Sequence, residues 1–363
     1  MIAGGVLVAG RITPDPDLLP VARDSISRFA AWVLAATTDA QFHLSALGGG
    51  LMVAGALVAH ELGRRNRRVA GFPIACGTGR LPTVLLASTA SLALGSALWG
   101  WTADATGAWQ PLFVSFVSVP AAVVLTYGVR PRAVVTGVLA GVVLTTPIAL
   151  LVHSVLCIPL GLPGVVSATT GMWASAIITF LVSDRTGWLQ RDLGNRVPGP
   201  DAASMGAVQW SVRRTLADFT EPQFYGNEWA GAGMILGLLV AAAVDPALAV
   251  YGSGLWAHVL LSQIATALLA TTMWRSSWRE HGWYPTFTPL VSFVPALVLA
   301  EGGSVLADGV AVVVGATVVP PLAFALGRRM PDGVHPFAGY VMAMTISCAA
   351  LVPVLTALPM ERV

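Results

Sequence analysis

The stretch WQPLFVSFVSVP at residues 109–120 recurs as WYPTFTPLVSFVP at residues 283–295, an offset of 174. Both copies begin with Trp, place a Pro two residues later and carry a second Pro inside an apolar run. A long-range internal repeat within a hydrophobic chain is typical of membrane proteins built from duplicated helical units. These two segments therefore predict the architecture before any single residue indicates a chemistry.

The composition is that of a membrane protein. Of the 363 residues, 55% are hydrophobic and 10% are charged, whereas a soluble domain carries about 25% charged residues. The charges form short islands between apolar runs of about twenty residues, the length of helix that crosses a bilayer core of ~30 Å. We expect an all-α, polytopic membrane protein with about ten transmembrane helices. The spans are expected near residues 43–61, 81–101, 109–128, 132–152, 163–183, 228–250, 254–274, 283–301, 307–327 and 335–357.

The arginines test this count independently. All 20 basic residues are arginine, and 16 of them fall in loops after the odd-numbered spans. Because positive loops stay in the cytoplasm, the pattern predicts a multi-pass protein of the cell membrane with both termini outside the cytoplasm. The 16 are Arg64, Arg65, Arg67, Arg68, Arg80, Arg130, Arg132, Arg185, Arg191, Arg196, Arg213, Arg214, Arg275, Arg279, Arg328 and Arg329.

The repeat extends well beyond the two quoted segments. Residues 41–42 match residues 223–224 at an offset of 182, and Gly128 matches Gly302 at an offset of 174. The match covers five spans in each copy, and because five is odd, the second copy is expected to lie upside down relative to the first. The expected organisation is an N-terminal segment 1–42, a first repeat 43–183, a cytoplasmic linker 184–227 and a second repeat 228–357.

Two shorter amphipathic helices are expected at the membrane surface. In residues 21–38, four apolar side chains between Phe29 and Ala36 fall on one helical face, which is typical of a helix lying in the interface. In the linker, apolar residues at 212, 216 and 219 recur at helical spacing beside Arg213 and Arg214. That spacing predicts a second surface helix.

The third and eighth spans are the expected location of a substrate pathway. A mid-span proline removes a backbone donor and frees a carbonyl four residues earlier. Helices broken at matching places of two repeats are the best sequence indication of a transporter site. The predicted pathway residues are Ser115, Ser118, Pro120, Thr286, Thr288, Ser292 and Pro295, with Ser262 and Gln263 from the seventh span. The alternative is that each Ser of a kinked helix bonds its own backbone.

Three ionisable residues in or near the spans are candidates for coupling transport to an ion. They are His258, Glu301 and His153. An ionisable group within a membrane span is a functional hypothesis by default. The alternative for each is a position near a helix end, in interfacial water.

Other functions find little support in these residues. No complete zinc-protease, nucleophile-elbow or phosphate-loop motif occurs, so no enzyme activity and no cofactor are predicted. The three cysteines are isolated, so neither a metal site nor a disulfide framework is expected. The net charge of +2 gives no indication of nucleic-acid binding.

We therefore expect an integral membrane transporter, or permease, for a small polar solute or ion, with its site between the third and eighth spans. Two alternatives stay open. One is a non-catalytic membrane subunit or scaffold that docks a partner through residues 184–227, and the other is a membrane-embedded enzyme acting on a lipid-linked substrate. The expected partners are membrane lipids and the transported molecule. The Gly-rich openings of the first and sixth spans predict close packing of the repeats or, alternatively, a homo-oligomer contact.

Overall fold

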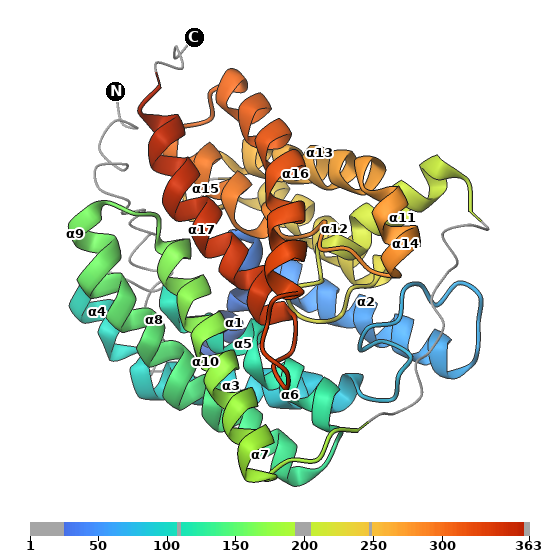
Figure 1. Cartoon of the computed structure of the whole chain (residues 1–363). Helices are drawn as coiled ribbons and strands as arrows, with labels where there is room; N and C mark the ends of the chain where they lie inside the picture. The colour runs from blue at the N-terminus through green and yellow to red at the C-terminus, as the bar shows by residue number, and fades with distance from the viewer. Residues whose placement is uncertain (1–24, 107–109, 193–204, 247–248, 359–363) are drawn as a thin grey trace.

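The computed structural model describes residues 25–106, 110–192, 205–246 and 249–358, in which all regular structure is helical (Figure 1). Eight helical segments are long enough and apolar enough to cross a membrane. The chain is thus an all-helical protein of the multi-pass membrane type. The segments are α2 (Ala46–Arg64), α3 (Leu81–Trp99), Gln110–Tyr127, Pro131–Leu160, α10 (Gly164–Thr186), α13 (Trp256–Met273), α16 (Val305–Gly327) and α17 (Phe337–Thr356).

Two of the ten expected spans are shorter than predicted. The span expected at 228–250 forms α12 (Glu228–Val244), an apolar helix of 17 residues. The span expected at 283–301 begins without helix and becomes helical only in η6 (Pro289–Val291) and α15 (Phe293–Ala300). Prolines at 285 and 289 cannot donate to a helical ladder, so they hold the start of this span out of a regular helix.

The third and eighth spans are interrupted at the same place. The third contains η3 (Gln110–Leu112), α5 (Val114–Val117) and α6 (Val119–Tyr127). It breaks at Ser118, with φ −126° and ψ −102°, and the eighth breaks at Ser292, with φ −147° and ψ −88°. Side chains 111–124 and 284–299 are all buried. Both broken segments therefore run through the centre of the protein. Trp109, expected at the membrane interface, lies outside the described residues.

The fourth span is the least regular of the long helices. Its helices α7 (Pro131–Ala140), α8 (Thr146–Val152) and α9 (Ile158–Leu160) are joined by two π-helical turns, Gly141–Thr145 and His153–Cys157. A proline follows each π turn within two residues. Because proline clashes with the preceding turn of a helix, it favours this local widening.

Two short helices follow long ones at the same spacing. Helix α4 (Trp101–Thr106) follows α3, and α14 (Arg275–His281) follows α13. The two helices begin at residues 101 and 275, which are separated by the offset of 174 read from the sequence. This match lies outside the two segments that first indicated the repeat.

Helices form in both segments where amphipathic helices are expected. In α1 (Ile26–Ala36) the apolar face that carries Trp32 packs into the protein. In α11 (Ala207–Asp218) the buried face mixes apolar and polar side chains, since Trp210 and Arg214 are both 1% exposed whereas Val212 is 48% exposed. Arg214 is buried because its guanidinium forms ion pairs inside the protein. The position of α11 at a membrane surface stays a prediction.

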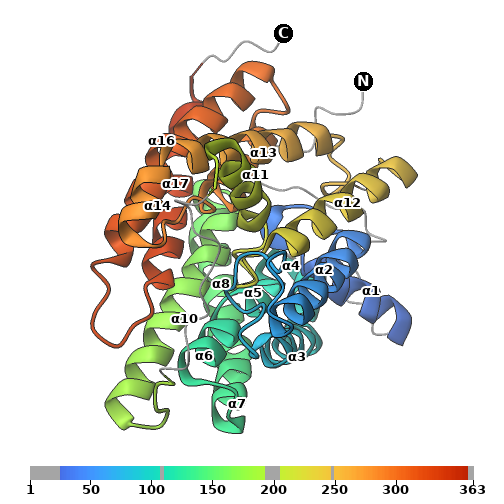
Figure 2. The same ribbon diagram turned by 90° about the vertical axis from the view of Figure 1, so that its right-hand side faces the viewer.

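The Gly-rich helices α2 and α12 lie beside each other (Figure 2) and run antiparallel. A Cβ atom on Gly55 would lie 2.2 Å from the carbonyl oxygen of Trp229, and one on Gly237 would lie 2.5 Å from that of Leu47. Only glycine permits so close an approach of two backbones. The Gly-rich segments are thus used for packing within the chain.

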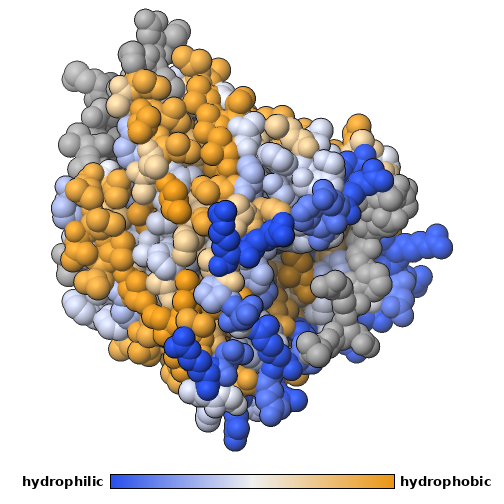
Figure 3. Space-filling model, in the orientation of Figure 1, coloured by the Kyte–Doolittle hydropathy of each residue, from blue (hydrophilic) through white to orange (hydrophobic). Residues whose placement is uncertain are grey.

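The charged loops gather at one end of the helices. Arg80 pairs with Asp192 at 2.9 Å, and Arg191 donates to the carbonyl oxygen of Gly333. The loops after α2, α10 and α16 therefore meet. In Figure 3 hydrophilic residues gather toward the lower and right-hand edges, whereas apolar residues cover much of the rest of this face. We call the end that carries these loops the arginine end.

Candidate functional site

Two turns with matching sequences meet inside the protein. Gln41 lies in the turn after α1, and Gln223 lies in the turn after α11. Each side-chain amide donates to the side-chain oxygen of the other, at 3.1 and 3.0 Å. Gln41 also donates to the Phe219 carbonyl at 2.6 Å, and Gln223 donates to the Thr37 carbonyl at 2.9 Å. The offset of 182 relates all four bonds, since residues 37 and 41 match 219 and 223.

The backbone repeats as well. Phe42 has φ 65° and Phe224 has φ 61°, a left-handed conformation that bulky residues rarely adopt. The same uncommon conformation at equivalent positions shows that the two turns share one shape. Such a backbone persists where the surrounding structure holds it in place, as the reciprocal amide bonds do here.

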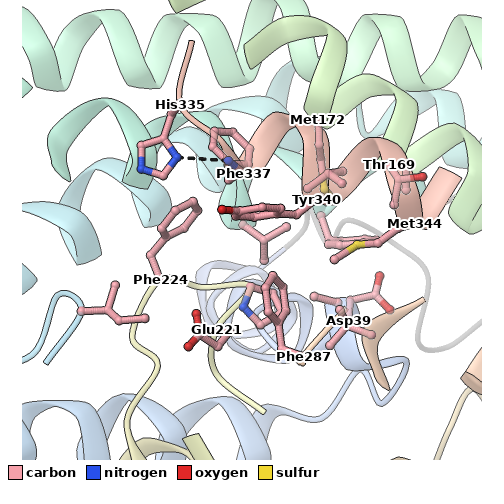
Figure 4. A pocket seen from close by; sticks show the side chains of 18 of the residues that line it. Asp39, Thr169, Met172, Glu221, Phe224, Phe287, His335, Phe337, Tyr340 and Met344 are labelled. Atoms are coloured by element: carbon pink, nitrogen blue, oxygen red, sulfur yellow. Dashed lines mark hydrogen bonds between the residues drawn. The ribbon is translucent and has the colours of Figure 1, made fainter. Parts of the chain in front are cut away.

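Each turn carries a buried carboxyl group at the equivalent position. These are Asp39 and Glu221, which are 2% and 6% exposed and are again related by 182. Both line a cavity of about 580 Å³ whose walls also include residues of the third and eighth spans, α10 and α17. Figure 4 shows the two carboxyl groups on the same side of this cavity.

Asp39 has one strong partner and one open oxygen. The Tyr251 hydroxyl donates to its Oδ1 at 2.5 Å, while Oδ2 has no hydrogen-bond partner among the described residues. Asp39 lies in a turn outside the membrane-spanning helices. Burial raises its pKa well above the usual range, and the Tyr251 bond opposes this only in part. A buried unpaired carboxylate oxygen is costly, so this atom favours a donor or a cation in the cavity.

Glu221 belongs to a buried ion-pair cluster. The Arg214 guanidinium donates to Oε1 of Glu221 and, at 2.7 Å, to Oδ1 of Asp218. It also lies between two aromatic rings, 5.0 Å from Phe72 and 4.7 Å from Trp278, close enough for cation–π attraction. Burial raises the pKa of Glu221 to about 7, and Arg214 opposes this shift.

The turn that carries Asp39 lacks this cluster. The positions equivalent to Arg214 and Asp218 at the offset of 182 are Trp32 and Ala36. Asp39 therefore has no guanidinium where Glu221 has one. The two carboxyl groups are matched in place but differ in charge balance.

The broken spans supply aromatic and apolar walls to the cavity. Phe113 and Val117 of the third span and Phe287 and Val291 of the eighth line it, and each pair matches the other at the offset of 174. In Figure 4, Phe287 lies between the carboxyl groups of Glu221 and Asp39 in this view, with Tyr340 and Met344 of α17 facing them.

A second, smaller cavity of about 350 Å³ continues toward the other end of the helices. The two cavities share Phe42, Gln110 and Val165 in their walls. The larger one extends to Arg80 at the arginine end, and the smaller one extends to Thr356. The two cavities thus adjoin at these three residues.

The predicted pathway hydroxyls are buried but point to their own helices. Ser118 Oγ donates to the Val114 carbonyl at 3.1 Å, and Ser292 Oγ donates to the Thr288 carbonyl at 2.7 Å. Ser115 and Thr288 likewise bond local carbonyls. Thr286 accepts from the Trp278 indole at 3.3 Å. None of the nine predicted pathway residues is part of the described walls of either cavity. They are Ser115, Ser118, Pro120, Ser262, Gln263, Thr286, Thr288, Ser292 and Pro295.

Gln263 ties the first turn to the eighth span. Its Nε2 donates to the carbonyls of Gln41 and Leu290 at 2.9 and 2.8 Å, and its Oε1 lies 2.9 Å from His43 Nε2. Gln263 therefore lies between the turn that contains Gln41 and the eighth span, and both of these segments contribute residues to the cavity wall. The sequence indicated that Gln263 lies deep in its span, and the structure adds its hydrogen-bond partners.

The three candidate coupling residues lie apart from the cavity. His258 Nδ1 is 2.6 Å from Asp308 Oδ2 near the start of α16, and His153 Nδ1 is 3.4 Å from Ser167 Oγ. Glu301 follows the end of α15 and is 9% exposed. The structure brings none of the three together among the described residues.

Sequence reasoning missed the acidic residues of the turns. Asp39 lies in the segment expected to precede the first span, and Glu221 lies in the linker, so neither was weighed as a buried group. The signal was available, because the offset of 182 that pairs residues 41–42 with 223–224 also pairs Asp39 with Glu221.

No protein-family model matches the chain, and no curated protein matches it. Among the described residues, no group of three or more His, Cys, Asp or Glu side chains is placed to hold a metal ion. The arrangement that remains is the larger cavity, lined by one carboxyl group from each of the two matching turns.

Proposed function

We propose that the chain is an integral membrane transporter that moves a small polar solute or ion through the central cavity. The observation that carries this proposal is the placement of Asp39 and Glu221, at equivalent positions of the two halves, in the wall of one cavity. Transporters built from repeats bind their substrates where the repeats meet. The broken third and eighth spans contribute to the same walls, as expected for such a site.

We further propose that the two halves are inverted repeats related by a two-fold axis between Gln41 and Gln223. Their reciprocal bonds support this, because each contact of one half recurs with the partners exchanged. The antiparallel crossing of α2 and α12 supports inversion, since equivalent helices of two parallel repeats would run the same way. The arginine end is then cytoplasmic and both termini are outside.

The two cavities differ in volume, which supports a transport cycle in which the two halves exchange conformations. Leu125 and Pro336 line the larger cavity, whereas their equivalents Leu299 and Pro163 line the smaller one. At these two positions, the wall of the smaller cavity is the counterpart of the wall of the larger one under exchange of the halves. If the smaller cavity enlarged while the larger one closed, a bound molecule would pass the three shared residues, Phe42, Gln110 and Val165, without a new site.

Cysteine labelling tests the inverted arrangement. In a cysteine-free background, Arg130→Cys and Arg328→Cys should react with a membrane-impermeant maleimide from the same side of sealed vesicles. Ser304→Cys, at the position equivalent to Arg130, should react from the opposite side. Reaction of positions 130 and 304 from one side would contradict the inversion.

Accessibility of the cavity tests transport itself. Thr169→Cys, in the cavity wall, should be labelled in proteoliposomes from either side, because the cavity opens alternately. Asp332→Cys, at the exposed arginine end, should react from one side only and reports how the protein is inserted. Ser262→Cys is the matched buried control and should stay unlabelled. Labelling of position 169 from one side alone would indicate a fixed vestibule and would refute the transporter.

The hydroxyls of Ser118 and Ser292 stay a prediction as pathway groups. Their bonds to the carbonyls of Val114 and Thr288 are also those of a broken helix that satisfies its own backbone. Once a transported molecule is known, an uptake assay with alanine at both positions separates these roles. Normal uptake would assign the hydroxyls to the helix break alone.

A further inference from the structure

The buried groups around the central cavity carry an excess of negative charge. Asp39 and Glu221 line the cavity, and Asp218 lies behind Glu221 as the second partner of Arg214. Three buried carboxyl groups are thus accompanied by one buried guanidinium, which pairs with Asp218 and Glu221 and not with Asp39. Arg80 also lines the cavity, but its charge is paired with Asp192 at 2.9 Å. Burial lowers the pKa of His335 in the wall to about 4, so this imidazole is neutral near pH 7.

The excess is centred on Asp39. Its Oδ2 is buried and unpartnered among the described residues, and the position equivalent to Arg214 is Trp32. A buried carboxylate is stable only when paired or protonated. A cation bound beside Asp39 would therefore supply the charge that Arg214 supplies to Glu221.

The rest of the wall selects the kind of cation. Aromatic rings of Phe42, Phe113, Phe224, Phe287 and Trp283 line the cavity. Rings attract a cation through the negative face of their π-systems, and such cages bind ammonium groups. A small metal ion needs several oxygen ligands at fixed distances, which walls so rich in apolar side chains do not offer. An anion would face the carboxylates directly.

Resting on the proposed transport function, we propose that the cavity binds a monovalent organic cation, a protonated or quaternary amine with an apolar body. The amine lies beside the Asp39 carboxylate, and the body packs on the aromatic walls. The volume of about 580 Å³ is in the range of pockets that enclose small organic ligands. Glu221, already paired with Arg214, lines the same side of the cavity without an unpaired charge.

A pair of probes with the same shape tests the charge requirement on the full, purified chain in detergent. Benzyltrimethylammonium carries the cation, and 2,2-dimethylpropylbenzene replaces its nitrogen by carbon. We expect the cation to bind at least tenfold more tightly in a calorimetric titration. Absence of cation binding, or equal binding of the neutral probe, would overturn the proposal without reference to any variant.

Asp39→Asn tests the residue. The change keeps the shape and the bond from Tyr251 but removes the charge, so it should weaken benzyltrimethylammonium at least tenfold and leave the neutral probe unaffected. Asp332→Asn removes an exposed carboxylate at the arginine end and is the matched control, with affinity unchanged. Full retention of cation binding by the Asp39 variant would refute the assignment.

Uptake separates this proposal from the function on which it rests. Binding of benzyltrimethylammonium without its uptake into proteoliposomes would contradict transport and leave the cation site standing. Conversely, uptake of an uncharged solute that excess benzyltrimethylammonium does not inhibit would support a transporter and overturn the cation site. The two failures are therefore distinct.

Discussion

Replacing Arg214 by methionine should destabilise the protein by about 4 kcal/mol. The side chain is 1% exposed, and it is the shared partner of Asp218 and Glu221. Removing one member of a buried ion pair costs ~3–5 kcal/mol because a charge is left unpaired. Keeping one carboxyl group of ordinary pKa near 4 protonated at pH 7 instead costs about 4 kcal/mol, at 1.36 kcal/mol per pH unit. Both routes give the same magnitude.

The assay is reversible unfolding in mixed micelles, read by tryptophan fluorescence and extrapolated to zero denaturant. Arg213→Met is the matched control on the same helix, since the Arg213 side chain is 25% exposed in its pair with Glu228. Its loss should be smaller, about 1 kcal/mol, because water screens a partly exposed pair. Methionine keeps most of the apolar volume at both positions.

Two further measurements separate charge from packing. Adding Asp218→Asn and Glu221→Gln to Arg214→Met should recover much of the loss, because neutral amides need no counter-charge. The loss in Arg214→Met should also shrink as pH falls, since unpaired carboxyl groups with raised pKa values destabilise the fold only above their unfolded pKa near 4. An Arg214 variant as stable as the Arg213 variant, or a triple variant no better than the single one, would refute the reasoning.

Two other predictions concern packing and titration. Gly55→Ala should lower the free energy of unfolding by ~1–3 kcal/mol through overpacking, because its Cβ would lie 2.2 Å from the Trp229 carbonyl oxygen. Gly50→Ala is the control, in open space on the same helix, and it should be neutral or stabilising by up to ~1 kcal/mol. Equal losses of stability in the two variants would contradict the close contact. Burial raises the pKa of Glu221 to about 7, so the wild-type chain should gain stability as pH falls from about 8 to 5. In Glu221→Gln the free energy of unfolding should depend less steeply on pH. If it changes with pH equally in both proteins in the same unfolding assay, Glu221 is excluded as the titrating group.

The all-helical class and most of the spans followed from the sequence because bilayer thickness fixes the length of an apolar helix. The same physics failed for residues 283–301. Apolar composition there reflects burial at the protein centre, where prolines and neighbouring helices, rather than the thickness of the bilayer, set the backbone. Mid-span prolines nonetheless located both breaks, since a missing donor acts on the backbone next to it.

The site depended on contacts that no local pattern records. The sequence left two roles open for the hydroxyls of Ser118 and Ser292, and each bonds a carbonyl of its own turn of helix. Asp39 and Glu221 were not among the predicted site residues, because nothing near them in the chain indicates burial. Only the pairing of the two turns through Gln41 and Gln223 encloses them.

The sequence by itself determined the helical membrane class and placed matching residues at offsets of 174 and 182, because hydropathy, proline positions and repeated residues are properties of the chain alone. Tertiary structure decided which polar groups face a common cavity and which bond their own backbone. The physical reason is that burial and charge pairing depend on neighbours far apart in sequence. Arg214 illustrates this, since the structure turns a residue expected at the surface into the centre of a buried ion-pair cluster.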